Sequence, residues 1–225
     1  MSEFVEKIEY QLENLENGFV IFQSPQLYKF TNDAVHLANF AKIKKTDVVV
    51  DFGSGSGVVS LLLNARHAPK QMYLFEIQKE MADMSVASVA ENNLSNMQVF
   101  NDKIQNASKL LDFKVDVVVS NPPYYKLGDK ADPKTLCHAI ARNEIEITLA
   151  GLVESVKKII KSKGRFFLCY PTARICELFA VLHQNNFGVK RLCFVSAKSK
   201  PSHILLCEAV YDSKCETVVE GEIVM

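Results

Sequence analysis

Two consecutive prolines, Pro122 and Pro123, directly follow an apolar run over residues 115–119. This run of valines, interrupted only by Asp116, is typical of a parallel strand that is buried on both faces. Proline cannot donate to a sheet ladder, so the strand has to end here. In an open parallel sheet, ligands bind beyond the carboxyl ends of the strands. The residues at this strand end, 121–125, are therefore candidates for a functional site.

A glycine-rich segment, residues 51–57, follows another apolar run over residues 48–50. Its three glycines, Gly53, Gly55 and Gly57, let the backbone approach a ligand closely, and the pattern of residues 58–65 predicts a helix after them. The spacing differs from the Gly-x-Gly-x-x-Gly of dinucleotide-binding enzymes. The carboxylate of Asp51 suits a cationic ligand and suits a pyrophosphate poorly.

Two further acids follow predicted strands. Glu76 ends a strand over residues 72–76 and lies 19 positions after Gly57, the offset expected for an acid that accepts both hydroxyls of a ribose. Asp102 follows a strand over residues 97–100. Each acid alone is equally well explained as a helix N-cap. Acids and glycines at successive strand ends together favour a shared ligand site.

These motifs resemble those of a known enzyme class. Asn121-Pro122-Pro123-Tyr124 resembles motif IV of the S-adenosylmethionine-dependent N6-adenine methyltransferases, and residues 51–57 resemble motif I of class I methyltransferases. The resemblance implies an α/β, Rossmann-like fold with a seven-stranded, mostly parallel sheet, an antiparallel last strand and helices on both faces. It implies S-adenosyl-L-methionine as the cofactor. The residues implied to bind it are Phe30, Thr31 and Asp33 of motif X, then Asp51, Gly53, Ser54, Gly55, Gly57, Glu76, Ile77, Asp102 and Asn121.

The motif IV residues fit the chemistry of amine methylation. An adenine amine is a poor nucleophile because its lone pair is conjugated with the ring. The Asn121 side-chain oxygen and the Pro122 carbonyl are expected to accept its two hydrogens, each contact contributing about 10²–10³ in rate by analogy with oxyanion-hole donors. Pro123 stiffens the turn, and Tyr124 offers a stacking face worth about 1–3 kcal/mol. The alternative is a proline-bounded strand end with incidental tyrosines.

A narrower resemblance points to RNA. Residues 32–35 and 139–144, together with the motifs above, are similar to the bacterial tRNA1(Val) adenine N6-methyltransferases, which modify the purine directly 3′ of the anticodon. The substrate implied is tRNA. Four alternatives stay open: a glutamine N5-methyltransferase of release factors, a DNA adenine methyltransferase, a ribosomal guanine-N2 methyltransferase and a catalytically silent RNA-binding protein. The first two usually carry additional domains for which this chain has little room.

The charge distribution indicates where RNA would bind. The chain is neutral, but residues 126–203 carry 14 Lys and Arg against 6 Asp and Glu. A basic segment beside the catalytic turn favours contact with a polyanion, although solvated surface lysines explain the same pattern. The candidate RNA contacts are Tyr125, Lys126, Lys130, Arg142, Lys198 and Lys200.

Other features narrow the class of protein. No apolar run approaches the ~20 residues of a membrane span, and no signal peptide is visible, so we expect a cytoplasmic protein. None of the six cysteines forms a Cys-x-x-Cys pair, so no metal site is expected.

The chain divides into three predicted segments. Residues 1–45 are expected to form an amphipathic helix, with Leu12 and Leu15 on its apolar face and Gly18 at its end, and then the motif X segment. Residues 46–211 form the predicted catalytic domain, in which a helix closes at Gly164 and strands over 189–195 and 203–210 end the sheet. Residues 212–225 are expected to be a loosely held acidic tail.

Overall fold

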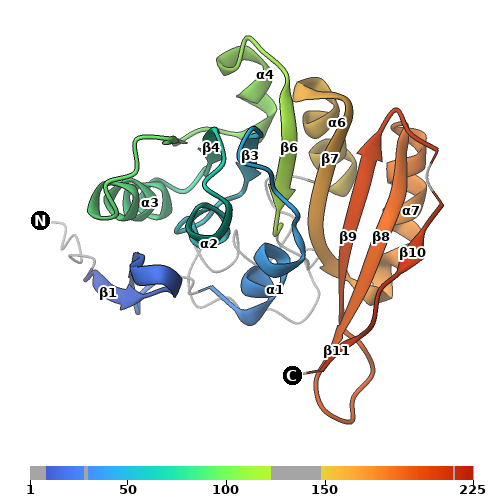
Figure 1. The fold of residues 1–225 in the computed structure, drawn as a ribbon, viewed down its shortest axis with the longest axis horizontal. Helices are drawn as coiled ribbons and strands as arrows, with labels where there is room; N and C mark the ends of the chain where they lie inside the picture. Colours follow the sequence, from blue (N-terminus) through green and yellow to red (C-terminus); the bar gives the residue numbers. More distant parts are fainter. Residues whose placement is uncertain (1–8, 28–29, 123–147, 215, 225) are drawn as a thin grey trace, which may run out of the picture.

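The strands that the apolar runs predict form the central sheet of the computed structural model (Figure 1). The structure describes residues 9–27, 30–122, 148–214 and 216–224. Within these ranges nine strands pair in the order β10-β8-β9-β7-β6-β3-β4-β5, with β11 also paired to β8. The strands are β3 (Val48–Phe52), β4 (Gln71–Phe75), β5 (Met97–Phe100), β6 (Val115–Ser120), β7 (Ile160–Pro171), β8 (Phe187–Ser196), β9 (Ile204–Tyr211), β10 (Val218–Val219) and β11 (Ile223–Val224).

Strand directions confirm the predicted fold class. Strands β3 to β7 are parallel to one another, and β9 lies between β7 and β8 and is antiparallel to both. The sheet is thus mostly parallel, with the last of its seven longer strands inserted antiparallel. Strand β8 consequently runs in the same direction as β6 and β7. The loop after β8 therefore emerges at the same edge of the sheet as the residues that follow β6.

Helices cover both faces of the sheet because alternate strand residues point to opposite sides. Val49 packs in one apolar cluster with residues of α1 and α2, whereas Val50 packs in a second cluster with residues of α4, α6 and α7. The described helices are α1 (Asn32–Phe40), α2 (Val58–His67), α3 (Lys79–Glu91), α4 (Ala107–Leu110), α6 (Leu149–Ile159) and α7 (Ile175–Gln184). Helix α6 ends at Ile159, five residues before Gly164, because β7 already begins at Ile160. None of these helices combines the length and hydropathy that a membrane span requires.

The ends of the central strands are aligned. Phe52 at the end of β3 is in register with Phe75 at the end of β4 and with Ser120 at the end of β6. The chain continues from β3 to β4 on one side, while β6 lies on the other side of β3. This point, where the strand order reverses, is where open α/β sheets form their ligand crevice. The residues that follow the three strands are therefore delivered to one crevice.

The predicted N-terminal helix is wrong for the described residues from 11 onward. Strands β1 (Gln11–Asn14) and β2 (Val20–Gln23) form an antiparallel hairpin, joined by a 3-10 turn over Glu16–Gly18. Asn17 and Gly18 have φ of 55° and 78°, the left-handed pair that an Asn-Gly hairpin turn requires. The outer edge of β2 hydrogen-bonds to α3: the Phe22 N–H donates to Ser88 Oγ at 2.9 Å. This long-range contact overrides the helical spacing of Leu12 and Leu15.

The C-terminal segment is more ordered than the sequence predicted. Strand β10 pairs parallel with β8 at Arg191 and Leu192, and β11 pairs with it at Val195 and Ser196. Glu220, between the two short strands, accepts from Arg191 at 2.8 Å. These pairings cover an edge of β8 that would otherwise present unpaired backbone groups. The acidic tail therefore belongs to the sheet.

Candidate active site

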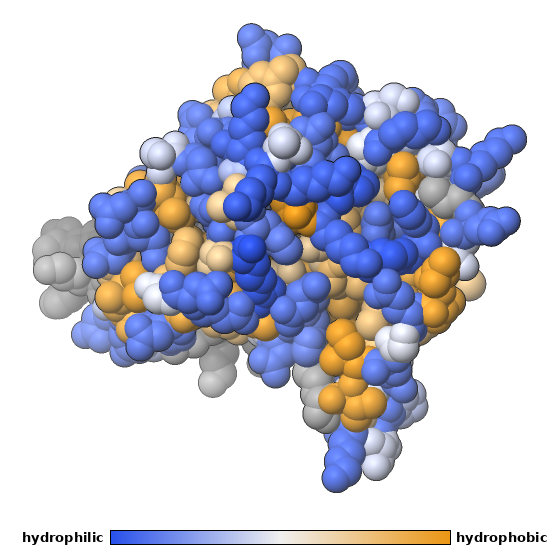
Figure 2. Space-filling model, in the orientation of Figure 1, coloured by the Kyte–Doolittle hydropathy of each residue, from blue (hydrophilic) through white to orange (hydrophobic). Residues whose placement is uncertain are grey.

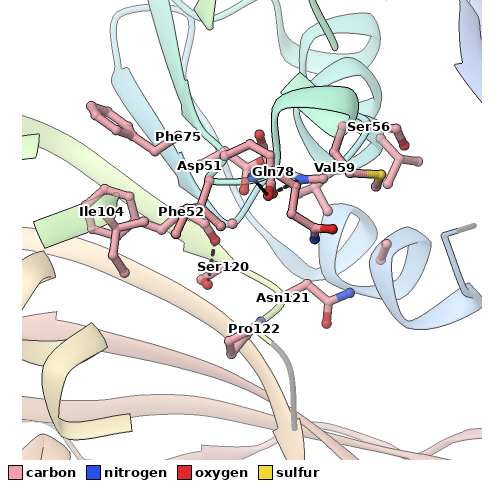
Figure 3. Close-up of a pocket in the computed structure, with 18 of the residues that line it drawn as sticks. Asp51, Phe52, Ser56, Val59, Phe75, Gln78, Ile104, Ser120, Asn121 and Pro122 are labelled. Carbon is pink, nitrogen blue, oxygen red and sulfur yellow. Dashed lines mark hydrogen bonds between the residues drawn. The ribbon is translucent and has the colours of Figure 1, made fainter. Parts of the chain in front are cut away.

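A pocket opens at the aligned ends of β3, β4 and β6 (Figure 3). In Figure 3, Phe75 and Ile104 lie together on one side of the pocket, and Asn121 and Pro122 lie on another. Eight of the predicted cofactor residues line it: Phe30, Asp51, Gly53, Ser54, Gly55, Glu76, Ile77 and Asn121. Pro122 of the predicted catalytic turn lines it as well. The pocket thus brings together predicted residues that lie up to 92 positions apart in sequence, from Phe30 to Pro122.

The glycine-rich loop, residues 53–57, forms one wall of the pocket. Gly53, Gly55 and Gly57 have φ of 70°, 57° and 88°, a region that residues with side chains rarely adopt. A Cβ on Gly57 would also lie 3.0 Å from Ser85 Oγ of α3. The N–H groups of Gly53 and Ser54 both donate to the Phe75 carbonyl, at 2.9 and 3.1 Å, which ties the loop to the end of β4. Glycine is therefore required here for backbone geometry and for packing against α3.

Asp51 places a buried carboxyl group at the base of this loop. Its side chain is 1% exposed and accepts a hydrogen bond from Ser60 Oγ at 2.7 Å. Burial raises the pKa of Asp51 to about 7, against the lowering effect of Ser60, and the charge of Glu76 adds to the rise. A carboxyl group in such surroundings is stabilised in its charged form by a cation in the pocket. Asp51 therefore gives this end of the pocket a preference for cationic ligands.

Glu76 organises the loop at the end of β4. One carboxylate oxygen accepts from the Gly55 N–H and the other accepts from the Gln78 N–H, each at 2.8 Å. Burial raises the pKa of Glu76, while these backbone donors act in the opposite direction. The Ile77 N–H is a third backbone donor to this carboxylate, which has about four acceptor positions and so retains capacity for a further donor. A ribose hydroxyl is such a donor.

Asn121 and Pro122 lie where β6 ends. The preceding residue, Ser120, is buried and donates from Oγ to the Phe52 carbonyl at 2.8 Å, so the end of β6 is fixed to the end of β3. Leu152 of α6 lines the pocket beside this turn. The structure thus describes the first half of the predicted catalytic turn. Pro123, Tyr124 and Tyr125, together with Lys126, Lys130 and Arg142, lie outside the described residues.

Four predicted cofactor residues do not line the pocket: Thr31, Asp33, Gly57 and Asp102. Thr31 is the N-cap of α1, and its hydroxyl donates to Asp33 Oδ2 at 3.3 Å. Asp102 Oδ1 accepts from the Lys103 N–H at 2.6 Å and from Asn106 Nδ2 at 2.7 Å. These contacts join residues that are close in sequence, and none of them is a side-chain cap of the helix that follows. A role for these residues toward a cofactor remains a prediction.

Several pocket residues were not predicted. The apolar ones are Ala34, Phe52, Val58, Val59, Phe75, Met81, Ile104 and Leu152, and the polar ones are Ser56, Gln78, Lys103, Gln105 and Ser120. Most belong to apolar strands and helices, where a pocket residue and a core residue have the same sequence pattern. Ser56 and Gln78 could have been predicted from the sequence, because they directly adjoin residues that the motifs identified. The apolar set gives the pocket walls that suit a flat aromatic group.

The Ser54 hydroxyl is a polar group in the pocket without a hydrogen-bond partner among the described residues. The Ser54 side chain is 5% exposed, and its hydroxyl forms no hydrogen bond within the described part of the chain. Buried hydroxyls are normally paired, so this one is available to a bound ligand. In the same part of the chain, no group of three or more His, Cys, Asp and Glu residues is arranged to hold a metal ion. The pocket therefore offers acceptors and a hydroxyl to an organic cation that carries hydroxyls and an aromatic ring.

Comparison with known proteins agrees with this geometry. A family model described as methyltransferase small domain matches residues 33–168. The chain is 25% identical over 169 residues to a tRNA1(Val) (adenine(37)-N6)-methyltransferase of Pseudoalteromonas translucida, covering 75% of this chain and 71% of that protein.

Solved structures show the same fold. A predicted O-methyltransferase from Agrobacterium tumefaciens superposes with a TM-score of 0.68 at 19% identity, covering 86% of this chain and 87% of the other. M. jannaschii TYW2 in complex with AdoMet superposes with a TM-score of 0.62 at 14% identity, covering 91% and 86%. The family match covers most of the pocket residues and the parallel strands β3 to β6.

Proposed function

This chain belongs to the methyltransferase small domain family, and we propose that it methylates the N6 amino group of an adenine in tRNA, namely adenine 37 of tRNA1(Val). The observation that carries the proposal is the shared pocket. It places a carboxyl group suited to a cation, Asp51, and a ribose-type acceptor, Glu76, in one cavity with the amine-type acceptors of Asn121 and Pro122. The curated relative named for this reaction supports the choice of target.

The pocket residues fit the methyl donor of the family, S-adenosyl-L-methionine. When bound, this cofactor supplies an electrophilic methyl group on a sulfonium sulfur. Asp51 holds a carboxylate toward the cationic part, and Glu76 accepts from the ribose with the acceptor capacity that its backbone donors leave open. The glycine-rich loop allows close approach, and the Ser54 hydroxyl gains the partner that it otherwise lacks. The apolar wall around Phe75 and Ile104 receives the adenine ring of the cofactor.

Asn121 and Pro122 act on the target amine. The side-chain oxygen of Asn121 and the carbonyl of Pro122 accept its two N–H groups, which directs the nitrogen lone pair toward the cofactor side of the pocket. The proton released from the methylated amine passes to water, so no general base is needed. Ser120 keeps these acceptors in place through its bond to the Phe52 carbonyl. Preorganised acceptors of this kind contribute about 10²–10³ each in rate.

Of the residues proposed to contact RNA, those that the structure describes lie on the β8–β9 hairpin. Its loop projects from the body of the protein at the edge of the sheet where β6 ends, and its tip is hydrophilic (Figures 1 and 2). Lys198 and Lys200 are exposed on this loop. Tyr125, Lys126, Lys130 and Arg142 are proposed as further contacts. A tRNA substrate places the enzyme in the cytoplasm.

Transfer of labelled methyl groups to separate RNA, DNA and protein fractions tests the proposal. We expect label in tRNA alone, and nuclease digestion should identify it as N6-methyladenosine. Label in release-factor glutamine or in guanine N2 of ribosomal RNA would contradict the proposed target while leaving the cofactor assignment intact. Failure to bind S-adenosyl-L-methionine would contradict the enzymatic function itself.

A further inference from the structure

The N-terminal hairpin is fastened to the cofactor side of the domain at several points. Its β2 strand exchanges hydrogen bonds with Asn92, the C-cap of α3: the Val20 N–H donates to Asn92 Oδ1 at 2.9 Å, and Asn92 Nδ2 donates to the Val20 carbonyl at 2.7 Å. Its turn is held to α2, because Arg66 forms two hydrogen bonds to the Glu16 carboxylate, at 2.6 and 2.7 Å. The hairpin therefore has a fixed position relative to the two helices that flank the glycine-rich loop.

The last residue of the hairpin reaches the loop itself. Gln23, at the end of β2, is 1% exposed, and its Nε2 donates to Ser56 Oγ at 2.6 Å. Ser56 is 2% exposed and lines the cofactor pocket. A short, fully buried hydrogen bond between two side chains fixes both of them. The loop is thus tied to a segment that lies outside the central sheet.

The other loop contacts come from within the domain. Gly53 and Ser54 are held by the Phe75 carbonyl, and Gly55 is held on one side by Glu76 and on the other by Ser85, whose Oγ donates to the Gly55 carbonyl at 2.8 Å. Among the described residues, the Ser56 side chain forms its hydrogen bond with Gln23. Gln23 Oε1 is buried without a partner among the described residues, an arrangement that costs stability. A buried glutamine with one unmatched acceptor contributes less to folding than an apolar residue of its size would.

We propose that Gln23 is a positioning residue for the cofactor: it fixes Ser56, and through it the glycine-rich loop, in the conformation that binds S-adenosyl-L-methionine. The inference rests on the cofactor part of the proposed function and is independent of the nucleic acid target. The N-terminal hairpin accordingly sets cofactor affinity and takes no part in methyl transfer. Loss of the Gln23–Ser56 bond frees the loop, so binding has to pay the cost of ordering it.

Calorimetric titration of the full chain with S-adenosyl-L-methionine tests this role. Gln23→Leu should weaken cofactor binding about five- to tenfold, the size of effect that one hydrogen bond produces. Ser56→Ala should weaken it similarly, and the double variant should be no weaker than either single one, because both remove the same bond. Turnover of Gln23→Leu at saturating cofactor should stay near the wild-type rate. The matched control is Gln11→Leu, the exposed residue paired with Gln23 in the hairpin, and it should bind normally.

Three outcomes separate the possibilities. Normal cofactor affinity in Gln23→Leu with a lower melting temperature would show a purely structural role and overturn the inference. Additive losses in the double variant would overturn it too, since the two side chains would then act separately. If Gln23→Leu does not fold, Ser56→Ala decides alone, because it deletes a single oxygen from the loop side. Absence of cofactor binding by the wild type would instead contradict the proposed function.

Discussion

Asp51 is a buried carboxyl group whose charge state depends on whether a cation occupies the pocket. Its carboxyl group is buried at the end of a central strand, and its pKa is raised to about 7. An aspartate in an unfolded chain releases its proton near pH 4. Between these values the folded, cofactor-free protein binds more protons than the unfolded chain, so its stability falls as the pH rises. The charged form of Asp51 therefore destabilises the cofactor-free protein, and a bound cation offsets this cost.

Cofactor affinity should consequently rise with pH. Between pH 5.5 and pH 7 we expect a gain of about tenfold, because a protonated Asp51 has to lose its proton before it can face the cation. This window lies below the pH at which an α-amino group itself loses its proton. Glu76, whose pKa is also raised, contributes in the same direction. Calorimetry across this range checks the prediction, and Asp51→Asn should flatten the profile. Affinity that falls or stays constant in the wild type would contradict it.

At the scale of elements, the sequence predicted those strands that are marked by an apolar run and by a characteristic residue at the strand end. The four parallel strands before the catalytic turn were predictable because each is a largely apolar run that is followed within two residues by a glycine, a proline or an acid. The β1–β2 hairpin was missed because its backbone bonds to Ser88 and Asn92, which lie more than 60 positions away. Asn17-Gly18 was the local signal for it. The apolar pocket walls, such as Phe75 and Ile104, have no sequence pattern that separates them from core residues.

The β8–β9 hairpin is the element on which substrate binding depends most in this account. Replacing Lys198 and Lys200 by alanine should weaken tRNA binding and reduce the slope of log affinity against log salt by about 0.7–0.9 per lost phosphate contact. Cofactor affinity should not change. Lys44→Ala with Lys45→Ala is the matched control, since these exposed lysines precede β3 at the opposite edge of the sheet. Equal tRNA affinity for the hairpin variant and the wild type across a salt series would show that these lysines are only solvated surface.

At the scale of the whole molecule, Arg191 joins parts of the chain that are distant in sequence. Its guanidinium donates to Glu208 of β9, to Glu220 of the C-terminal segment at 2.8 Å and to the Phe40 carbonyl at the end of α1 at 3.1 Å. It also lies 4.3 Å from the centre of the Phe40 ring. Helix α1 carries Ala34, which lines the pocket. The buried cation of Arg191 thus connects the edge of the sheet to the helix that contributes Ala34 to the pocket.

Removing that cation should destabilise the whole fold. Arg191→Ala leaves Glu208 buried without its partner, which typically costs about 3–5 kcal/mol of unfolding free energy. Denaturant unfolding followed by circular dichroism measures the change. Glu220→Ala is the control, because Glu220 is 37% exposed and its loss should cost about 1 kcal/mol or less. Equal, small losses in the two variants would show that the buried pair is not the centre of this network.

Adenine methylation by the Asn-Pro-Pro-Tyr turn is tested most directly by identifying the modified nucleoside. A tRNA1(Val) transcript is incubated with S-adenosyl-L-methionine and the enzyme, digested to nucleosides and examined by mass spectrometry. The wild type should produce N6-methyladenosine, and a transcript with guanine in place of adenine 37 should stay unmodified. Asn121→Ala should lower the rate of N6-methyladenosine formation at least about 100-fold, with little change in cofactor affinity. Undiminished N6-methyladenosine from Asn121→Ala, or methylated guanosine from the wild type, would contradict the account.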